Sequence, residues 1–286
     1  MTSKKPQLSK SRFIAGLQCH KRLYLECFHY DERDEITSAQ QSVFDSGTKV
    51  GDLARDYIPG GVLIDEDHTQ QLQANERTAK LVEEGQIEAI YEAGFTFDDI
   101  KIRVDILRNN KDGTYDIIEV KSSTKPKDEH IDDIAIQVYV LKGCGIEVRN
   151  YFLMTIDSSY VYQGGDYDIH KLFKLHDLTE QVKEKMIMVL ATLSEMRKHL
   201  ERASAPCREI GSHCKKPYTC SFFNYCHKGL PEDHITKLPR LSEKNLNLLR
   251  SQNVERIPEI PDDFSKLTAT QFRAKDRKST RLNSSH

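Results

Sequence analysis

Two carboxylates and a lysine, Asp105, Glu119 and Lys121, lie on two strand-like segments that a turn connects. Segments 102–107 and 114–121 are rich in β-branched and aliphatic residues, and the Asn-Asn-Lys-Asp-Gly run between them tolerates a tight turn. With the turn centred on this run, residues whose numbers sum to about 224 face each other across the hairpin. The hairpin therefore places Asp105 opposite Glu119.

This arrangement predicts a metal site. Side chains alternate along a strand, so Glu119 and Lys121 emerge on the same face. Adjacent carboxylates repel each other unless a cation lies between them, and ligands that are all oxygen suit Mg²⁺ or Mn²⁺. A neighbouring lysine stabilises the negative charge that gathers on a phosphate during its hydrolysis. The alternative interpretation is a solvated hairpin with an ordinary pair of Lys and Glu on one strand.

Asp105, thirteen further residues, the run Glu119-Val120-Lys121 and then Gln137 together resemble the RecB-like branch of the PD-(D/E)XK nucleases. The resemblance implies an α/β fold, with a restriction-endonuclease-like mixed sheet flanked by helices. It also implies that Asp105, Glu119 and the Val120 carbonyl hold Mg²⁺ or Mn²⁺. Lys121 would position and activate the attacking water, and Gln137 would orient the substrate or Lys121.

Two positions depart from the family's pattern. The family has a tyrosine four residues after its glutamine, whereas this chain has Leu141 there and Tyr139 two residues after Gln137. Many relatives use an upstream histidine as a further metal ligand, but segment 45–61 contains none. Either fewer protein ligands hold the metal, or Glu92 takes the place of the histidine. The alternative for Glu92 is an exposed acid on a strand.

The second group of chemically informative residues consists of cysteines. Of the seven cysteines, Cys207, Cys214, Cys220 and Cys226 fall in one stretch, and Cys19 lies far upstream. The amino end is polar and no apolar run approaches about 18 residues, so we predict neither a secretory signal nor a membrane span and expect a cytoplasmic protein. In a reducing compartment, clustered cysteines favour metal or cluster ligation over disulfides.

The cysteine layout resembles RecB-like nucleases of the iron–sulfur type, a group that includes the CRISPR-adaptation nucleases. These proteins hold a 4Fe-4S cluster with one cysteine before the nuclease core and three after it. The resemblance implies four ligands, Cys19, Cys214, Cys220 and Cys226. Cys207 is either a substitute for one of them or a plain loop thiol. We expect the cluster to be structural, because it would close a span of nearly two hundred residues.

Zinc is the alternative occupant of the cysteine site. His213 and His227 flank the cysteines, and mixed Cys and His ligands suit tetrahedral Zn²⁺. The gaps between the cysteines are wider than the close pairs of most zinc modules, and the aromatic residues between them would shield a cluster from water. Both features favour the cluster.

Composition is that of a folded globular protein, with 286 residues of which 38% are hydrophobic and 30% charged. The formal net charge of −2 lacks the strongly basic field expected of a protein that binds DNA without regard to sequence. Basic residues do gather at the amino end.

We predict three parts: a nuclease-like domain with the Fe–S cluster over 1–230, the start of a truncated helical element over 231–276, and a non-native tail over 277–286. The layout is also similar to poorly characterised bacterial proteins in which a nuclease-like half precedes a further domain. That further domain would be missing here.

The expected function is that of a metal-dependent deoxyribonuclease acting on single-stranded DNA or DNA ends. The alternatives are a non-catalytic module that binds nucleic acid around a structural Zn or Fe–S site, and a scaffold for the missing carboxyl-terminal domain. The sequence predicts no particular oligomeric state.

Several elements must position these residues. Ser9 is the predicted N-cap of a first helix that includes Cys19. Periodicity predicts further helices over 68–85, 130–142, 177–203 and 241–251, and strands over 87–97, 149–156 and 160–163. The helix over 130–142 would carry Gln137 off its apolar stripe.

Overall fold

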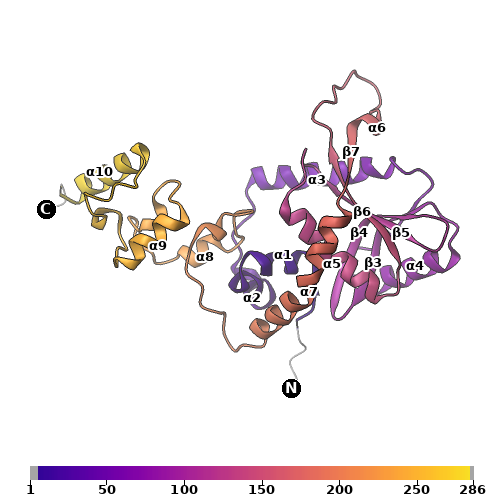
Figure 1. Cartoon of the computed structure of the whole chain (residues 1–286), viewed down its shortest axis with the longest axis horizontal. Coiled ribbons are helices and arrows are strands. Elements are labelled where there is room, and N and C mark those ends of the chain that lie inside the picture. The colour runs from indigo at the N-terminus through magenta and orange to yellow at the C-terminus, as the bar shows by residue number, and fades with distance from the viewer. Residues whose placement is uncertain (1–5, 284–286) are drawn as a thin grey trace. The chain divides into compact units, whose positions relative to one another are not determined.

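The structure is a computed structural model that describes residues 6–283, with side chains described as far as residue 277 (Figure 1). The chain divides into two compact units. The sheet unit consists of the residues up to Leu17 together with Glu35–Ser204, and the cysteine unit consists of Gln18–Asp34 together with the residues from Ala205 onward. The last three residues of the predicted tail, 284–286, lie outside the described residues.

The sheet unit is built on a seven-stranded mixed sheet. Its strands are β1 (Leu8–Ser9), β2 (Val62–Leu63), β3 (Ala89–Phe97), β4 (Ile100–Asn109), β5 (Tyr115–Lys121), β6 (Val148–Ile156) and β7 (Phe173–Asp177). The order is β2-β3-β4-β5-β6-β7, and β1 pairs with β4. The pairs β1–β4, β2–β3 and β5–β6 are parallel and the others antiparallel. The mixed α/β class predicted from the sequence is confirmed.

The β4–β5 hairpin has the predicted register. Ile106 faces Ile118, and each further pair toward the turn keeps the same sum of residue numbers. Gly113 in the turn has a φ of 87°, which a glycine adopts without steric cost. The ladder ends at Ile106 and Ile118. The next residues, Asp105 and Glu119, therefore lie where the two strands separate.

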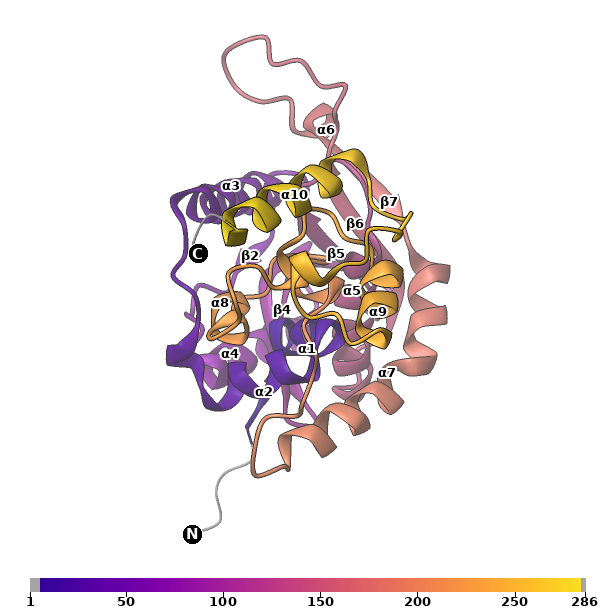
Figure 2. The ribbon, with the colours of Figure 1, turned by 90° about the vertical axis from the view of Figure 1, so that its left-hand side faces the viewer.

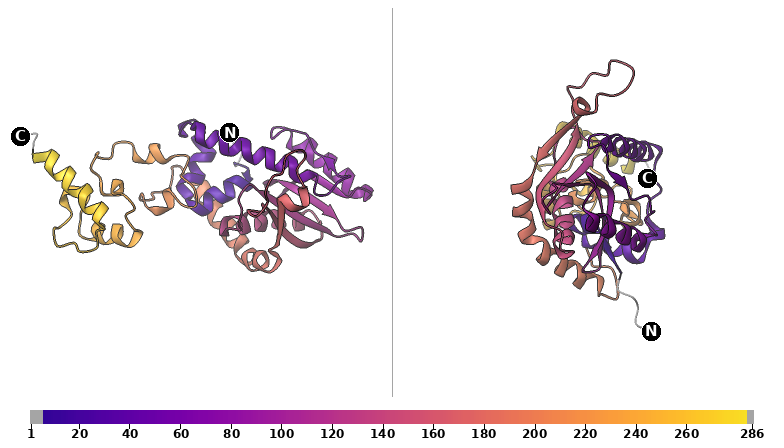
Figure 3. Two further views of the ribbon diagram at one scale, coloured as in Figure 1. Left: turned by 90° about the horizontal axis from the view of Figure 1, so that it is seen from above. Right: turned by 90° about the vertical axis from the view of Figure 1, so that its right-hand side faces the viewer.

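Helices of the sheet unit cover both faces of this sheet. The helices of the described residues are α1 (Lys10–Gln18), α2 (His20–Phe28), α3 (Ser38–Arg55), α4 (Gln71–Glu84), α5 (Asp128–Gly143), α6 (Ile169–Leu172), α7 (Thr179–Leu200), α8 (Phe223–His227), α9 (Glu243–Ser251) and α10 (Ala269–Asn283). Of these, α2 and α8 to α10 belong to the cysteine unit. Helix α5 packs on α7 and on β3, β4 and β6, whereas α3 packs on β5. The right-hand view of Figure 3 shows α7 on one side of the strands and α3 on the other.

The alternation of side chains along β5 separates the core from the polar site. Ile118 and Val120 pack with Val50 and Ala54 of α3 in a hydrophobic core. Glu119, between them, must point to the opposite face, which α5 covers. Full burial of one such isoleucine stabilises the fold by about 1.5–3 kcal/mol, so this core fixes the face on which Glu119 emerges.

The prediction that Cys19 lies within the first helix is wrong. Helix α1 ends at Gln18 and α2 begins at His20, and Cys19 between them has an extended backbone with φ −167° and ψ 122°. The expected cap is present, since Ser9 Oγ accepts a hydrogen bond from the Arg12 N–H at 3.3 Å. The break matters because it changes the direction of the chain at the cysteine.

The strand predicted over 160–163 is also wrong. These residues belong to the loop before α6, which extends away from the sheet (Figure 1). Val161 and Tyr162 are mostly exposed, so the segment has no apolar face to bury. Strand β7 pairs with β6 instead and buries Phe173.

The cysteine unit has two small cores. Leu25, Cys220 and Phe222 form one of them, with Tyr225 packed against it. The other includes Leu249 and Ile257, and it holds α9 and the residues that lead to α10 (Figure 2). No helix in the described part of the chain is long and apolar enough to cross a membrane.

Within the second core, two similar segments pair with each other. The Ile235 N–H donates to the Glu255 carbonyl at 2.9 Å, and the Ile257 N–H donates to the Asp233 carbonyl at 2.7 Å. Each segment continues into a short 3₁₀ turn and then into a helix, α9 or α10. This internal repeat was not found in the sequence, because its period rests on few matching residues.

Candidate functional site

Glu119 is the centre of a polar network at the point where β5 leaves β4. Its side chain is fully buried. Lys10 Nζ donates to Oε1 at 2.9 Å and to Oε2 at 3.2 Å, Gln137 Nε2 donates to Oε2 at 2.7 Å, and Lys121 Nζ donates to Oε1. Burial alone would raise the pKa of Glu119, but the charges of Lys10 and Lys121 hold it well below its usual range. Glu119 is therefore a carboxylate.

Asp105 lies beside Glu119 on the neighbouring strand. Its Oδ2 accepts a hydrogen bond from the Val120 N–H at 2.7 Å, where a continued hairpin would have had a ladder bond. Burial, together with the charge of Glu119, raises the pKa of Asp105 to about 7. At about pH 7 roughly half of the Asp105 carboxyls are protonated, and a bound cation would favour the carboxylate form.

Lys121 lies between two acids. Its Nζ is 2.8 Å from Asp133 Oδ2 and also donates to Glu119. Burial would lower the pKa of Lys121, yet Glu119 and Asp133 raise it above its usual value. Lys121 is therefore an ammonium, which can donate hydrogen bonds and stabilise negative charge but cannot accept a proton.

Helix α5 supplies Gln137 and Asp133, which are one turn apart and so share a face of the helix. Gln137 is fully buried, and its Nε2 also lies 3.2 Å from the Asp133 carbonyl. Its Oε1 is buried and has no hydrogen-bond partner among the described residues. A buried acceptor of this kind fits a ligand that brings a donor, such as a water molecule on a metal ion.

Glu92 lies near the same site. The register of β3 and β4 puts it opposite Asp105, but the two residues do not pair. Its φ of 54° is in the left-handed region, which costs about 1–3 kcal/mol for a residue other than glycine. Burial raises the pKa of Glu92, while the charge of Lys10 lowers it. Glu92 is half-buried rather than an exposed strand acid.

Sequence reasoning missed Lys10 and Asp133. Asp133 could have been predicted from the sequence, because it precedes Gln137 by four residues on a predicted helix and so shares a face with it. Lys10 had none, since it is 109 residues from Glu119 in the chain. Strand β1 explains its position: Leu8 pairs with Ile100 at the start of β4, so α1 begins beside the separated strands.

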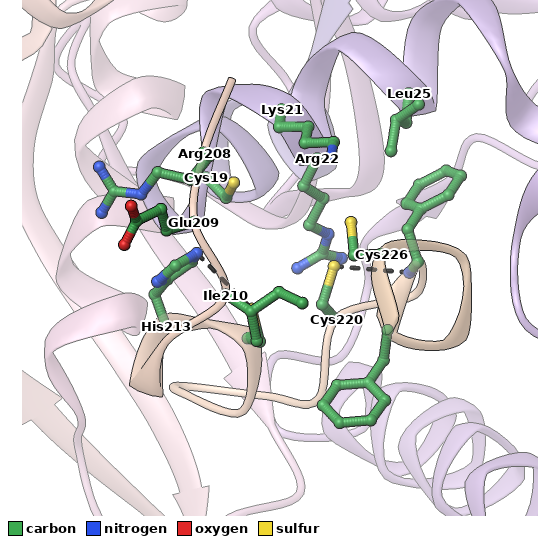
Figure 4. Close-up of a pocket in the computed structure, with 13 residues that line it drawn as sticks. Cys19, Lys21, Arg22, Leu25, Arg208, Glu209, Ile210, His213, Cys220 and Cys226 are labelled. Atoms are coloured by element: carbon green, nitrogen blue, oxygen red, sulfur yellow. Dashed lines mark hydrogen bonds between the residues drawn. The ribbon is translucent and has the colours of Figure 1, made fainter. Parts of the chain in front are cut away.

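The cysteine unit contains the second candidate site, a pocket between α2 and the segment 208–226. Its lining includes four cysteines, Cys19, Cys214, Cys220 and Cys226 (Figure 4). Among the described residues, no three of these sulfurs lie within 4.8 Å of one another. Four thiolates on one zinc ion would lie roughly 3.8 Å apart. The four sulfurs are therefore farther apart than the ligands of one zinc ion.

Three thiols of the pocket have raised pKa values. Burial raises the pKa of Cys220 to about 11, and burial also raises the pKa of Cys214 and Cys226. Figure 4 shows the Arg22 guanidinium beside the Cys220 sulfur. Arg22 Nε is buried without a hydrogen-bond partner among the described residues, although it lies 3.6 Å from Glu26 Oε1. This donor fits an anionic sulfur.

The remaining candidate ligands are placed differently. His213 lines the pocket, and its Nε2 lies 3.6 Å from Cys214 Sγ. His227 is stacked on Phe223, and its Nδ1 lies 2.6 Å from the Phe223 carbonyl, so the ring is turned to the backbone. Cys207 is exposed and is not among the residues that line the pocket.

Comparison with known proteins adds little. No family model matches the chain, and no curated protein matches it. Nine chains of solved structures match. One of them, from the crystal structure of SSO0001, aligns with 66% of this chain and 79% of that chain at 14% identity, with a TM-score of 0.32. A likeness this distant carries no argument about the site.

Proposed function

We propose that the chain is a metal-dependent nuclease of the RecB-like PD-(D/E)XK type. It would hydrolyse phosphodiester bonds of single-stranded DNA or of DNA ends. The observation that carries this proposal is the fully buried Glu119 carboxylate, held by two lysines and Gln137 beside Asp105. Buried charge is costly unless it is paired, and sites that retain it are often functional.

The donor set fits Mg²⁺ or Mn²⁺. Asp105 and Glu119 offer carboxylate oxygens from two strands at the point where the strands separate, and the Val120 carbonyl is their neighbour on β5. The ion would supply Lewis acidity and lower the pKa of a bound water. Gln137 would hold the Glu119 carboxylate in place, and its Oε1, which has no hydrogen-bond partner among the described residues, would accept a hydrogen bond from a ligand.

Lys121 would stabilise the negative charge that develops on the phosphate. Because Lys121 is an ammonium, it acts by donating hydrogen bonds and by its charge rather than as a base. Asp133 would keep Lys121 pointed at the reacting centre through the 2.8 Å contact. Lys121 is thus the catalytic lysine and Asp133 is a positioning residue.

We propose in addition that the cysteine pocket holds a 4Fe-4S cluster with Cys19, Cys214, Cys220 and Cys226 as ligands. Three observations support a cluster over Zn²⁺: four thiols line one pocket, their sulfurs are spread too widely for a single zinc ion, and the cationic Arg22, whose Nε has no hydrogen-bond partner among the described residues, lines the same pocket. The cluster would be structural, since it would tie Cys19 to the segment after residue 207.

The test is cleavage of end-labelled single-stranded and duplex DNA by protein purified without oxygen, in the presence of Mn²⁺, Mg²⁺ or EDTA. We expect cleavage that requires the metal. Lys121→Ala should reduce the rate by about 10²- to 10³-fold, because one charge-stabilising donor is lost. Lys142→Ala is the matched control, since this exposed lysine lies at the other end of α5.

Two results would contradict the proposal. One is the absence of cleavage by a folded, iron-loaded wild-type protein under every metal condition. The other is a Lys121→Ala variant that cleaves as fast as the Lys142→Ala control. DNA binding without cleavage would instead identify a binding module.

A further inference from the structure

Lys10 has no role in the proposed mechanism, yet it makes as many contacts in the site as Lys121. Its Nζ donates to both oxygens of Glu119 and lies 3.7 Å from Asp133 Oδ1. The Glu119 side chain is fully buried and that of Asp133 is 9% exposed, whereas that of Lys10 is 25% exposed. The lysine therefore reaches the acids from the solvent side.

The position of Lys10 is fixed by the fold rather than by chance contact of a terminal tail. Leu8 and Ser9 pair with Ile100 and Lys101 of β4. Leu8 is 2% exposed, and the Leu8 N–H donates to the Asp99 carbonyl at 3.0 Å. Lys10 is the next residue and the first of α1. Its backbone is therefore anchored, while its side chain has four rotatable bonds with which to move.

The charges of the site leave no place for Lys10 once a metal is bound. Asp105, Glu119 and Asp133 can carry three negative charges. One divalent ion and the ammonium of Lys121 together balance them, so a further cation among the acids would be in excess. Uncompensated charge in a buried site is costly, which favours the exit of one lysine. Lys10 is the one that leaves, because its Nζ lies 3.7 Å from Asp133, whereas Lys121 Nζ lies 2.8 Å from the same carboxylate.

We propose that Lys10 is the resident cation of the carboxylate site: its ammonium holds Glu119 and Asp133 until a divalent metal ion displaces it, and it then contacts the substrate phosphate. This inference rests on the proposed metal-dependent nuclease. It makes Lys10 a second active-site lysine with two positions. Exchange of one cation for another also explains how buried acids remain ordered without metal.

The test is the affinity for Mn²⁺ in the absence of DNA, measured on the whole protein by the electron paramagnetic resonance signal of free Mn²⁺. Lys10→Met removes the competing charge, so its Kd for Mn²⁺ should be about 5- to 100-fold lower than that of the wild type. Lys142→Met is the control. It removes the same charge at the far end of α5, more than about 10 Å away, where salt screens it.

The second measurement is the rate of DNA cleavage at saturating Mn²⁺. Lys10→Met should cleave more slowly than the wild type by about tenfold or more, because a donor to the phosphate is lost. Tighter metal binding together with slower cleavage is a combination that a merely structural lysine would not produce. Lys10→Gln, which keeps a hydrogen-bond donor for Glu119, replaces Lys10→Met if that variant does not fold.

The outcomes separate this inference from the function on which it rests. An unchanged or raised Kd for Mn²⁺ in both Lys10 variants would overturn the inference. A Lys10 variant that cleaves DNA at the wild-type rate at saturating Mn²⁺ would overturn it as well. If the wild type, the control and the Lys10 variants all fail to bind Mn²⁺, the proposed metal site itself is wrong.

Discussion

The carboxylate site and the cysteine pocket hold reactive side chains in opposite ways. In the carboxylate site, Glu119 meets two ammonium groups and an amide, so the protein itself supplies the opposite charge. In the cysteine pocket, four cysteines share one space, and burial raises the pKa of three of them, Cys214, Cys220 and Cys226. The carboxylate site is thus held together by the protein's own charges, whereas the cysteine pocket contains no such pairing between its thiols and would gain its counter-charge from the cluster proposed above.

The helices and strands that carry the residues of the two sites also differ in length. Asp105, Glu119 and Gln137 are on strands of ten and seven residues and on a helix of sixteen. Cys214 ends a 3₁₀ turn of three residues, and Cys226 is in a helix of five. Elements this short are not stable alone, so tertiary contacts or a bound group must hold them.

The largest expected effect comes from removing a ligand of the pocket. Cys220→Ser should lose bound iron and the hydrogen-exchange protection of the cysteine unit, while the sheet unit keeps its own protection. A structural metal site contributes on the order of 10 kcal/mol to folding. Iron analysis and hydrogen exchange read by mass spectrometry measure the two effects.

Cys207→Ser is the control for this change, because Cys207 is exposed and outside the pocket. It should retain iron and protection. If Cys220→Ser removed the hydrogen-exchange protection of the sheet unit together with that of the cysteine unit, the two sites would not be ordered independently.

A substitution in the hydrophobic core of the sheet unit should destabilise that unit, and by less than loss of a cluster ligand destabilises the cysteine unit. Leu193 of α7 is fully buried, so Leu193→Ala should lower the free energy of unfolding of the sheet unit by about 2–5 kcal/mol. Leu190, on the same helix, is 63% exposed, and Leu190→Ala should change it by at most about 0.5 kcal/mol. Urea denaturation followed by circular dichroism measures both. Loss of iron from Leu193→Ala would contradict independent ordering.

The smallest expected effect is a pH dependence of the free energy of unfolding that arises from the carboxylate site. An unfolded aspartate ionises near pH 4, whereas Asp105 in the folded, metal-free protein keeps its proton until about pH 7. The folded state therefore binds more protons between these values, and the free energy of unfolding falls as pH rises from about 4 to 7.

Asp105→Asn should remove this fall, which we expect to total on the order of 1–3 kcal/mol. The measurement is urea denaturation in EDTA at several pH values for the wild type and the variant. Parallel pH curves for the two proteins would show that Asp105 titrates normally and that the site is less closed than its contacts indicate.

The hairpin could be predicted because its information is local. Alternating apolar residues and a glycine-containing turn fix the register, and the register alone brings Asp105 to Glu119. Lys10 could not be predicted, because its position depends on a two-residue strand that pairs with β4 about ninety residues later in the chain. Such pairing leaves no periodic signal.

The cysteines show the same limit. The resemblance to iron–sulfur nucleases implied four candidate ligands, and these four cysteines do line one pocket. The break of the helix at Cys19 was missed, because Phe13, Leu17 and Leu23 fit one continuous helical pattern across it. Tertiary packing decides such a break, because the nearby Gly16 lies within α1 and does not end it.

The two segments of the cysteine unit are separated in the chain by Glu35–Ser204, the larger segment of the sheet unit. During synthesis, Cys19 is made before Glu35–Ser204 of the sheet unit, and Cys214 to Cys226 are made after this segment. At about 5–20 residues per second, this delay is on the order of 10–40 s. The sheet unit has that interval in which to fold first. Whatever group the pocket binds can enter only after Cys226 has left the ribosome, so its insertion is a late step in maturation.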